Sequence, residues 1–81
     1  MPPRVTLYTR QGCHLCDTAK QQLRRASRRA DFDLEEIDID SDPRLRALYS
    51  EEVPVIAING RKAFKFHVDE ASFLKSLKDR S

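Results

Sequence analysis

The chain has 81 residues, enough for one small domain over residues 1–81 and too few for a large barrel or a multi-domain enzyme. Hydrophobic residues make up 40% of it and charged residues 35%, a balance typical of a folded soluble domain and not of a disordered segment. Fifteen Lys and Arg against thirteen Asp and Glu leave a net charge of +2, which is too small to indicate a nucleic-acid partner.

The sequence lacks the apolar segments that membrane insertion or secretion requires. Its longest apolar run, residues 53–58, is far shorter than the ~20 residues that span a bilayer. The first residues, Met1-Pro2-Pro3-Arg4, lead directly into a strand-like segment without the apolar core of a signal peptide. We therefore expect a cytoplasmic protein with no membrane partner.

The first part of the chain predicts a strand, a helix and a second strand. Residues 4–9 are rich in β-branched and aromatic side chains, which favour a strand. Beyond Gln11-Gly12, small and apolar residues recur at helical spacing and share one face: Leu15, Ala19, Leu23, Ala26 and Ala30. Residues 32–39 predict the second strand, and because its apolar residues change parity, we expect a start near Leu34 or a bulge.

The next part predicts a short helix and a β-hairpin. Asp42-Pro43 supplies an N-cap followed by proline at the first helical position. Residues 53–58 are apolar on both alternating faces, which is typical of a strand covered on both sides. Asn59-Gly60 favours a two-residue turn, because both residues tolerate positive φ, and makes the following strand antiparallel.

The last part predicts the second strand of the hairpin and a final helix. Residues 61–68 alternate, and we expect their apolar members to be buried: Phe64, Phe66 and Val68. Asp69 is expected to cap a helix with a buried face of Phe73, Leu74 and Leu77. The order β-α-β-α-β-β-α then predicts an α/β fold, with a mixed four-stranded sheet and helices on both faces.

The two cysteines, Cys13 and Cys16, lie where the first strand gives way to the first helix. Near the helix N-cap, the Cys13 sulfur would face unpaired backbone N–H groups at the positive end of the helix dipole. Both favour the thiolate, and cysteines so placed have pKa values lowered from ~8.5 to about 3.5–7.5. Cys16 follows one helical turn later, within disulfide reach of Cys13. The spacing therefore predicts a catalytic pair, with Cys13 as the more exposed attacking thiolate and Cys16 as the resolving thiol.

The same C-x-x-C spacing also occurs as half of a metal site. Zinc requires four ligands, and the other candidates here are His14 and His67. His14 lies between the thiols and projects from another helical face, so we expect no metal site within one chain. The alternative to catalysis is a non-catalytic zinc, iron–sulfur or redox-sensing module whose metal a second chain helps to bind.

Val53-Pro54 opens the strand that is expected to be covered on both faces. Proline donates no hydrogen bond to a β-ladder, so the pair is unusual inside a sheet. A trans proline that begins an edge strand and a cis peptide bond are both compatible with the sequence.

These features together resemble the glutaredoxin-like proteins of the thioredoxin superfamily. The likeness covers nearly the whole chain and rests on Tyr8-Thr9-Arg10 before the C-x-x-C pair, on the Val-Pro pair and on the Asn-Gly hairpin. Among subgroups, the chain is most similar to short glutaredoxin-like proteins with a C-x-L-C site. The resemblance implies a thioredoxin-like fold and thiol–disulfide oxidoreductase activity. It also implies that the Val53-Pro54 peptide bond is cis and lies beside the Cys13 sulfur, and that the Val53 backbone pairs with an extended substrate segment. Arg10 matches a basic residue that would favour the Cys13 thiolate and meet a glutathione carboxylate; alternatively, it is a solvated loop residue.

Three positions depart from the patterns of these families. His14-Leu15 stands where glutaredoxins usually carry Pro-Tyr; a protonated His14 would favour the reduced form, and an exposed surface histidine fits equally well. The Gly-Gly pair of glutathione-binding members would fall at Phe64 and Lys65, so their usual glutathione site is missing. Leu7 replaces the buried acid that thioredoxins carry in the first strand.

The expected partners follow from this chemistry. We expect a disulfide-containing protein or small molecule as substrate and glutathione or a reductase as electron donor, with no tightly bound cofactor. The candidate substrate-binding residues are Arg10, His14, Val53 and Pro54. The basic residues near the end of the first helix predict either a solvated face or a docking patch for an acidic partner or nucleic acid, although no aromatic residue lies among them for base stacking: Arg24, Arg25, Arg28 and Arg29.

Overall fold

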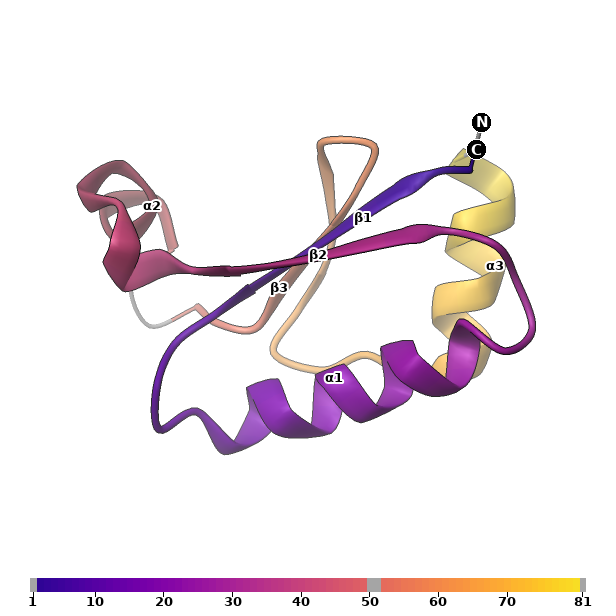
Figure 1. Ribbon diagram of the computed structural model, residues 1–81, viewed down its shortest axis with the longest axis horizontal. Helices are drawn as coiled ribbons and strands as arrows, with labels where there is room; N and C mark the ends of the chain where they lie inside the picture. Colours follow the sequence, from indigo (N-terminus) through magenta and orange to yellow (C-terminus); the bar gives the residue numbers. More distant parts are fainter. Residues whose placement is uncertain (1, 50–51, 81) are drawn as a thin grey trace.

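The structure, a computed structural model, describes residues 2–49 and 52–80 (Figure 1). This part of the chain contains four strands and three α-helices. In chain order they are β1 (Arg4–Thr9), α1 (His14–Ala26), β2 (Asp33–Asp38), α2 (Pro43–Tyr49), β3 (Val55–Ile58), β4 (Arg61–Lys65) and α3 (Glu70–Arg80). A short 3-10 turn, η1 (Ile39–Ser41), joins β2 to α2. The predicted order of strands and helices is confirmed, and none of these described helices has the length and apolar character needed to cross a membrane.

The strands form one mixed sheet in the order β2-β1-β3-β4. β1 and β2 are parallel, and α1 makes the crossover that a parallel pair requires. β3 is antiparallel to both β1 and β4. Tyr8 pairs with Val55, so the last residues of β1 and the first of β3 lie side by side at the same end of the sheet.

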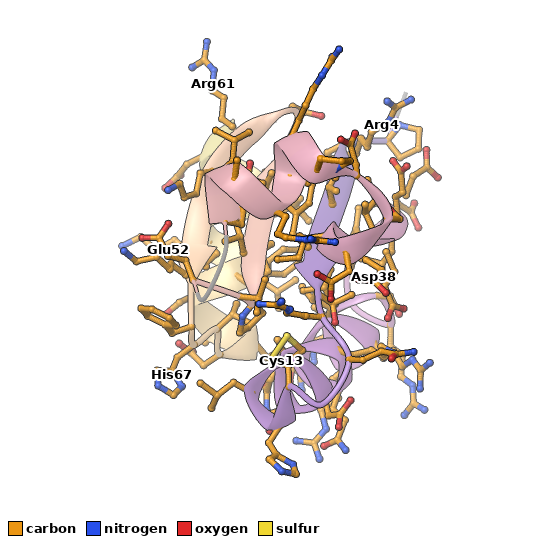
Figure 2. The ribbon with its side chains drawn as sticks, turned by 90° about the vertical axis from the view of Figure 1, so that its left-hand side faces the viewer. Arg4, Cys13, Asp38, Glu52, Arg61 and His67 are labelled. Carbon is orange, nitrogen blue, oxygen red and sulfur yellow. A yellow bond between two sulfur atoms is a disulfide. The ribbon has the colours of Figure 1, made fainter. Side chains whose placement is uncertain are left out.

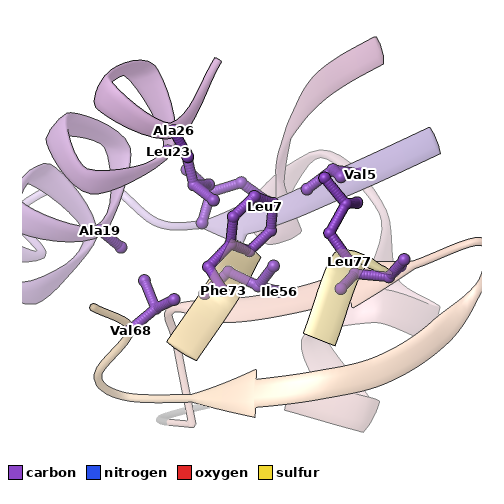
Figure 3. Packing of buried hydrophobic residues seen from close by; sticks show 10 residues of the cluster. Val5, Leu7, Ala19, Leu23, Ala26, Ile56, Val68, Phe73 and Leu77 are labelled. Atoms are coloured by element: carbon purple, nitrogen blue, oxygen red, sulfur yellow. The ribbon is translucent and has the colours of Figure 1, made fainter. Parts of the chain in front are cut away.

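Helices cover both faces of the sheet, as predicted. α1 and α3 pack on the face that carries Leu7, where Leu23 and Phe73 are fully buried (Figure 3). Tyr8 projects to the opposite face because successive strand residues alternate, and its ring centroid lies 4.6 Å from that of Tyr49 in α2. The buried residues of the main core are Val5, Leu7, Ala19, Leu23, Ala26, Ile56, Ile58, Val68, Phe73 and Leu77.

The buried face of α1 differs from the predicted one at its first turn. Its buried residues are Cys16, Ala19, Leu23 and Ala26. Leu15 is 39% exposed, although helical spacing places it on the same side as Ala19, because the first turn of α1 meets the rest of the fold through Cys16. Ala30 lies beyond the end of the helix but packs against the core. The prediction that Leu15 shares the buried face is therefore wrong.

β2 follows the prediction of a start near Leu34. It begins at Asp33, and its six pairs with β1 show no register shift, so the alternative of a bulge is wrong. β2 is an edge strand whose residues 33–36 are exposed. A strand exposed in this way does not need a strict apolar alternation, which explains the change of parity.

β4 is shorter than predicted. It ends at Lys65 and does not continue to Val68. Phe66 has a φ of 69°, a left-handed conformation that directs the chain out of the sheet, and its side chain is 37% exposed. Val68 is buried and Phe64 packs against the core, so of the three expected buried residues Phe66 alone is wrong.

The predicted turn and helix caps are present. Asn59 and Gly60 have φ values of 52° and 84°, as a two-residue turn of type I′ requires. At the start of α2, Asp42 Oδ1 accepts a hydrogen bond of 2.8 Å from the backbone amide two residues on. At the start of α3, Asp69 Oδ2 accepts one of 3.0 Å from the Ser72 N–H.

The cap of α3 predicts a pH-dependent contribution of Asp69 to stability. Hydrogen bonds from Ser72 hold the pKa of Asp69 below its ordinary value of 3.8. A carboxyl group with a lower pKa in the folded state stabilises the fold above its unfolded pKa, and the contribution is lost as pH falls through the folded pKa. We expect Asp69→Ala to lower the thermal unfolding midpoint at neutral pH, and its difference from wild type to shrink below pH 3.8.

Asp69→Asn is the matched control for this measurement, because asparagine also caps helices but does not titrate. It should keep most of the wild-type midpoint at neutral pH. An Asp69→Ala variant that unfolds at the wild-type temperature at neutral pH would contradict the role of the cap.

Candidate active site

Cys13 is the N-cap residue of α1, as predicted. Its backbone is extended, with φ −91° and ψ 105°, and its sulfur accepts a hydrogen bond of 3.1 Å from the Cys16 backbone N–H. Serine, threonine or aspartate usually occupies this position in a helix. The sulfur therefore pairs with one of the N–H groups left free at the helix start, at the positive end of the helix dipole.

Cys13 and Cys16 form a disulfide, with their Cα atoms 5.2 Å apart. This separation lies within the range that disulfides adopt, and the helix itself provides it. Cys16 is 2% exposed, whereas Cys13 is half-buried and reaches the surface (Figure 2). Cys13 is thus the more exposed of the two sulfurs, as predicted.

A tight turn carries the chain from β1 into α1. Gly12 has a φ of 79°, which glycine adopts without steric cost. The Cys13 N–H donates a hydrogen bond of 3.3 Å to the Arg10 carbonyl oxygen and closes the turn. The glycine before the first cysteine therefore places that cysteine at the start of the helix.

The Val53–Pro54 peptide bond is cis, as the resemblance implied. The Val53 carbonyl oxygen lies 4.0 Å from the Cys13 sulfur. Both residues precede β3, which begins at Val55 and not at residue 53 as predicted. The missing N–H of Pro54 therefore falls outside the ladder, which accounts for a proline at this position.

A second, smaller core supports the disulfide. Its buried members are Cys16, Ile39 and Val53, against which Tyr8, Cys13, Leu45 and Tyr49 pack. Burial, followed by the neighbouring Tyr49, raises the pKa of Tyr8 above its ordinary value of 10.0, so this phenol is neutral at physiological pH. Tyr8, Ile39 and Tyr49 were not predicted to belong to the site, although the alternation of β1 places Tyr8 on the face opposite Leu7.

Arg10 is held beside the site by ion pairs. Its Nε lies 3.0 Å from Asp40 Oδ2, and Arg46 Nε lies 3.2 Å from the other oxygen of that carboxylate. Asp40 belongs to η1, so these pairs connect the turn before Cys13 to the segment that follows β2. Arg10 thus forms an ion pair beside the site, with its side chain 38% exposed.

An open cavity of about 410 Å³ adjoins Cys13. Arg10 and Cys13 both line it, together with residues of opposite charge such as Lys20 and Glu36, whose Nζ and Oε1 atoms are 2.8 Å apart. The lining of this cavity does not include His14 or the Val53–Pro54 segment. Arg10 therefore lies at the cavity beside Cys13. The Val53–Pro54 segment lies outside this cavity, and it approaches the Cys13 sulfur through the Val53 carbonyl oxygen.

His14 is exposed at the first position of α1. Among residues 2–49 and 52–80, no three His, Cys, Asp or Glu side chains are grouped so that they could hold a metal ion. A metal bound at the two cysteines would need ligands from outside this part of the chain.

Two departures from the glutaredoxin and thioredoxin patterns lie in the sheet and in the main core. Phe64 and Lys65, at the Gly-Gly position, both lie in β4 and pair with Ile56 and Val55 of β3. Leu7, at the position of the thioredoxin acid, is fully buried in the main core. These positions serve the sheet and the core here.

The chain matches known proteins over most of its length. The family described as Glutaredoxin-like domain (DUF836) matches residues 4–78. The uncharacterized protein Rv0508 of Mycobacterium tuberculosis is 37% identical over 73 residues, which cover 84% of this chain and 75% of that protein.

Solved structures share the fold. The X-ray structure of XcR50 from X. campestris has a TM-score of 0.78 at 34% identity, covering 93% of this chain and 96% of that chain. Thioredoxin-2 of the malaria parasite has a TM-score of 0.75 at 16% identity, covering 96% and 82% of the two chains, and shows the fold alone. The chain therefore belongs to the glutaredoxin-like domain family and has a thioredoxin-like fold, with its two cysteines at disulfide distance at the start of the first helix.

Proposed function

We propose that this protein is a thiol–disulfide oxidoreductase that exchanges electrons through Cys13 and Cys16. The observation that carries the proposal is the hydrogen bond of 3.1 Å from the Cys16 N–H to the Cys13 sulfur at the start of α1. In the reduced protein, this donor and the helix dipole both favour the thiolate of Cys13. Membership of the glutaredoxin-like family supports the same chemistry.

Cys13 acts as the nucleophile because its sulfur reaches the surface. Its thiolate attacks one sulfur of a substrate disulfide, the substrate S–S bond breaks, and a mixed disulfide with Cys13 forms. The departing substrate sulfur leaves as a thiolate and takes a proton from water.

Cys16 acts as the resolving thiol. After it loses its proton, it attacks the Cys13 sulfur, breaks the mixed disulfide and releases the second substrate thiolate. The protein then carries the Cys13–Cys16 disulfide and has given two electrons to the substrate, which also gains two protons. Regeneration takes two electrons, either from two glutathione thiols, which leave as glutathione disulfide, or from the dithiol of a reductase.

Substrate contacts are proposed on two sides of the sulfur. An extended segment that pairs with the Val53 backbone would bring its disulfide to Cys13, because the Val53 carbonyl oxygen is 4.0 Å from that sulfur. Arg10, held by Asp40, supplies a positive charge for a carboxylate of a substrate or of glutathione. The exposed His14 offers a further contact at the helix start.

The proposal extends to the cellular compartment of the reaction and to its electron donor. We place the reaction in the cytoplasm, where reducing conditions keep such cysteine pairs able to donate electrons. The donor is glutathione or a reductase; the continuous strand at Phe64 and Lys65 means that glutathione would bind without the usual Gly-Gly site. The substrate is a disulfide-containing protein or small molecule.

Serine variants of the two cysteines should separate their roles. Cys13→Ser is expected to lower the rate of reduction of a model disulfide on the order of a thousandfold or more, because the attacking sulfur is lost. Cys16→Ser should still attack but should accumulate the mixed disulfide, which mass spectrometry detects as the protein plus half of the substrate. Gln21→Ser, on the exposed side of α1, is the matched control and should keep wild-type activity. Full activity of Cys13→Ser would contradict the proposal.

The difference in burial predicts selective alkylation of the reduced protein. Cys16 is 2% exposed and Cys13 is half-buried, so iodoacetamide should modify Cys13 at least about tenfold faster. At mildly acidic pH, where an ordinary thiol of pKa ~8.5 is almost fully protonated, Cys13 should still react. Peptide mass spectrometry after brief exposure measures both rates. Equal rates, or protection of both thiols, would count against Cys13 as the free nucleophile.

A further inference from the structure

Phe66 has a backbone conformation that bulky residues rarely adopt. Its φ of 69° lies in the left-handed region, which is an outlier for a large side chain. Among residues 2–49 and 52–80, the other non-glycine residue with positive φ is Asn59, which occupies the hairpin turn where that conformation is required. Such conformations persist where the surrounding structure fixes them, and they cluster at functional sites.

Two contacts hold Phe66 in this position. Its N–H donates a hydrogen bond of 2.8 Å to the Pro54 carbonyl oxygen. The Lys65 ammonium lies 5.3 Å from the centroid of the Phe66 ring, and it also pairs with Glu52 Oε1 at 3.1 Å. The ring nevertheless remains 37% exposed. Phe66 therefore presents apolar surface at this position, and the ammonium beside its ring is itself paired with a carboxylate.

The backbone of Phe66 is bonded directly to the loop beside the disulfide. The hydrogen bond joins Phe66 to Pro54, and the preceding residue, Val53, has its carbonyl oxygen 4.0 Å from the Cys13 sulfur. Figure 2 shows Cys13 near the centre of this view, with Glu52, which pairs with Lys65, and His67, the residue after Phe66, to one side. Leu15, between the two cysteines, adds a second exposed apolar side chain at 39%.

We propose that Phe66 is a specificity-determining residue that contacts an apolar side chain next to the half-cystine of an extended peptide substrate. The inference rests on the proposed function, and it names the class of substrate. A peptide strand that pairs with Val53 directs its side chains alternately to either side, so a residue close to its cysteine can reach the loop that carries Phe66. Glutathione has only glycine and a γ-linked glutamate beside its cysteine and offers no apolar side chain to this ring.

The test compares two peptide disulfides that differ in one residue next to the cysteine, leucine in one and serine in the other. Pre-reduced protein reacts with each peptide in a single turnover, followed by the release of a quenched fluorophore, so that the protein dithiol supplies both electrons. Burial of one apolar side chain against an aromatic ring strengthens binding about tenfold. At peptide concentrations below saturation, wild type should therefore react about tenfold faster with the leucine peptide than with the serine peptide. Phe66→Asn, which tolerates the left-handed backbone, should bring the ratio close to one.

Two further variants make the result specific to the ring. Phe66→Tyr keeps an aromatic ring and should keep the preference for leucine. Leu34→Ala removes an apolar side chain of similar exposure, 39%, from β2 at the other end of the sheet and should leave the ratio unchanged. Circular dichroism and the thermal unfolding midpoint establish that each variant is folded before it is compared.

The outcomes distinguish this inference from the proposed function. If wild type reduces both peptides and bis(2-hydroxyethyl) disulfide, and the leucine-to-serine ratio is the same in Phe66→Asn, the role of Phe66 is overturned and the proposed function stands. If wild type reduces none of the three disulfides, the proposed function fails and this inference fails with it. A wild-type dimer in analytical ultracentrifugation that Phe66→Asn abolishes would show that a second copy covers the ring, and would also overturn the inference.

Discussion

The hydrogen bond from the Cys16 amide to the Cys13 sulfur is the contact on which the proposed chemistry depends. It forms because the turn at Gly12, between β1 and α1, places Cys13 at the N-cap position. Helices usually have serine, threonine or aspartate at this position. A thiolate accepts such a bond more strongly than a thiol, so the contact that closes the helix start also favours the reactive form of the sulfur. The atom that caps the helix is therefore also the attacking sulfur of the proposed reaction.

Two packed regions keep that atom in place. The main core, between the sheet and the helices α1 and α3, fixes the axis of α1. The smaller core around Cys16, Ile39 and Val53 fixes its first turn. Val53 also presents its carbonyl oxygen to the Cys13 sulfur, so the same apolar contacts support the helix start and the loop that faces it. An ion pair joins Arg10, in the turn before Cys13, to η1.

Features with a local cause could be predicted from the sequence, and features decided by distant contacts could not. The Asn59-Gly60 turn and the N-cap position of Cys13 each follow from residues adjacent in the chain, and both are confirmed. The cis bond at Val53–Pro54 was reached through the family resemblance, because the residues themselves were compatible with both isomers. The exposure of Leu15 and the left-handed turn at Phe66 depend on how α1 and β4 meet the rest of the fold, so hydrophobic periodicity assigned both side chains to the interior.

A redox titration of the purified protein would examine the cysteine pair most directly. The protein is equilibrated with dithiothreitol buffers of graded potential, its free thiols are trapped by alkylation, and mass spectrometry counts them. If the pair at the start of α1 is a reversible two-electron carrier, a single transition should connect a monomer with both thiols free to a monomer with both joined. A cysteine that titrates without the other, or a disulfide that joins two chains, would show that these sulfurs do not act as one redox unit.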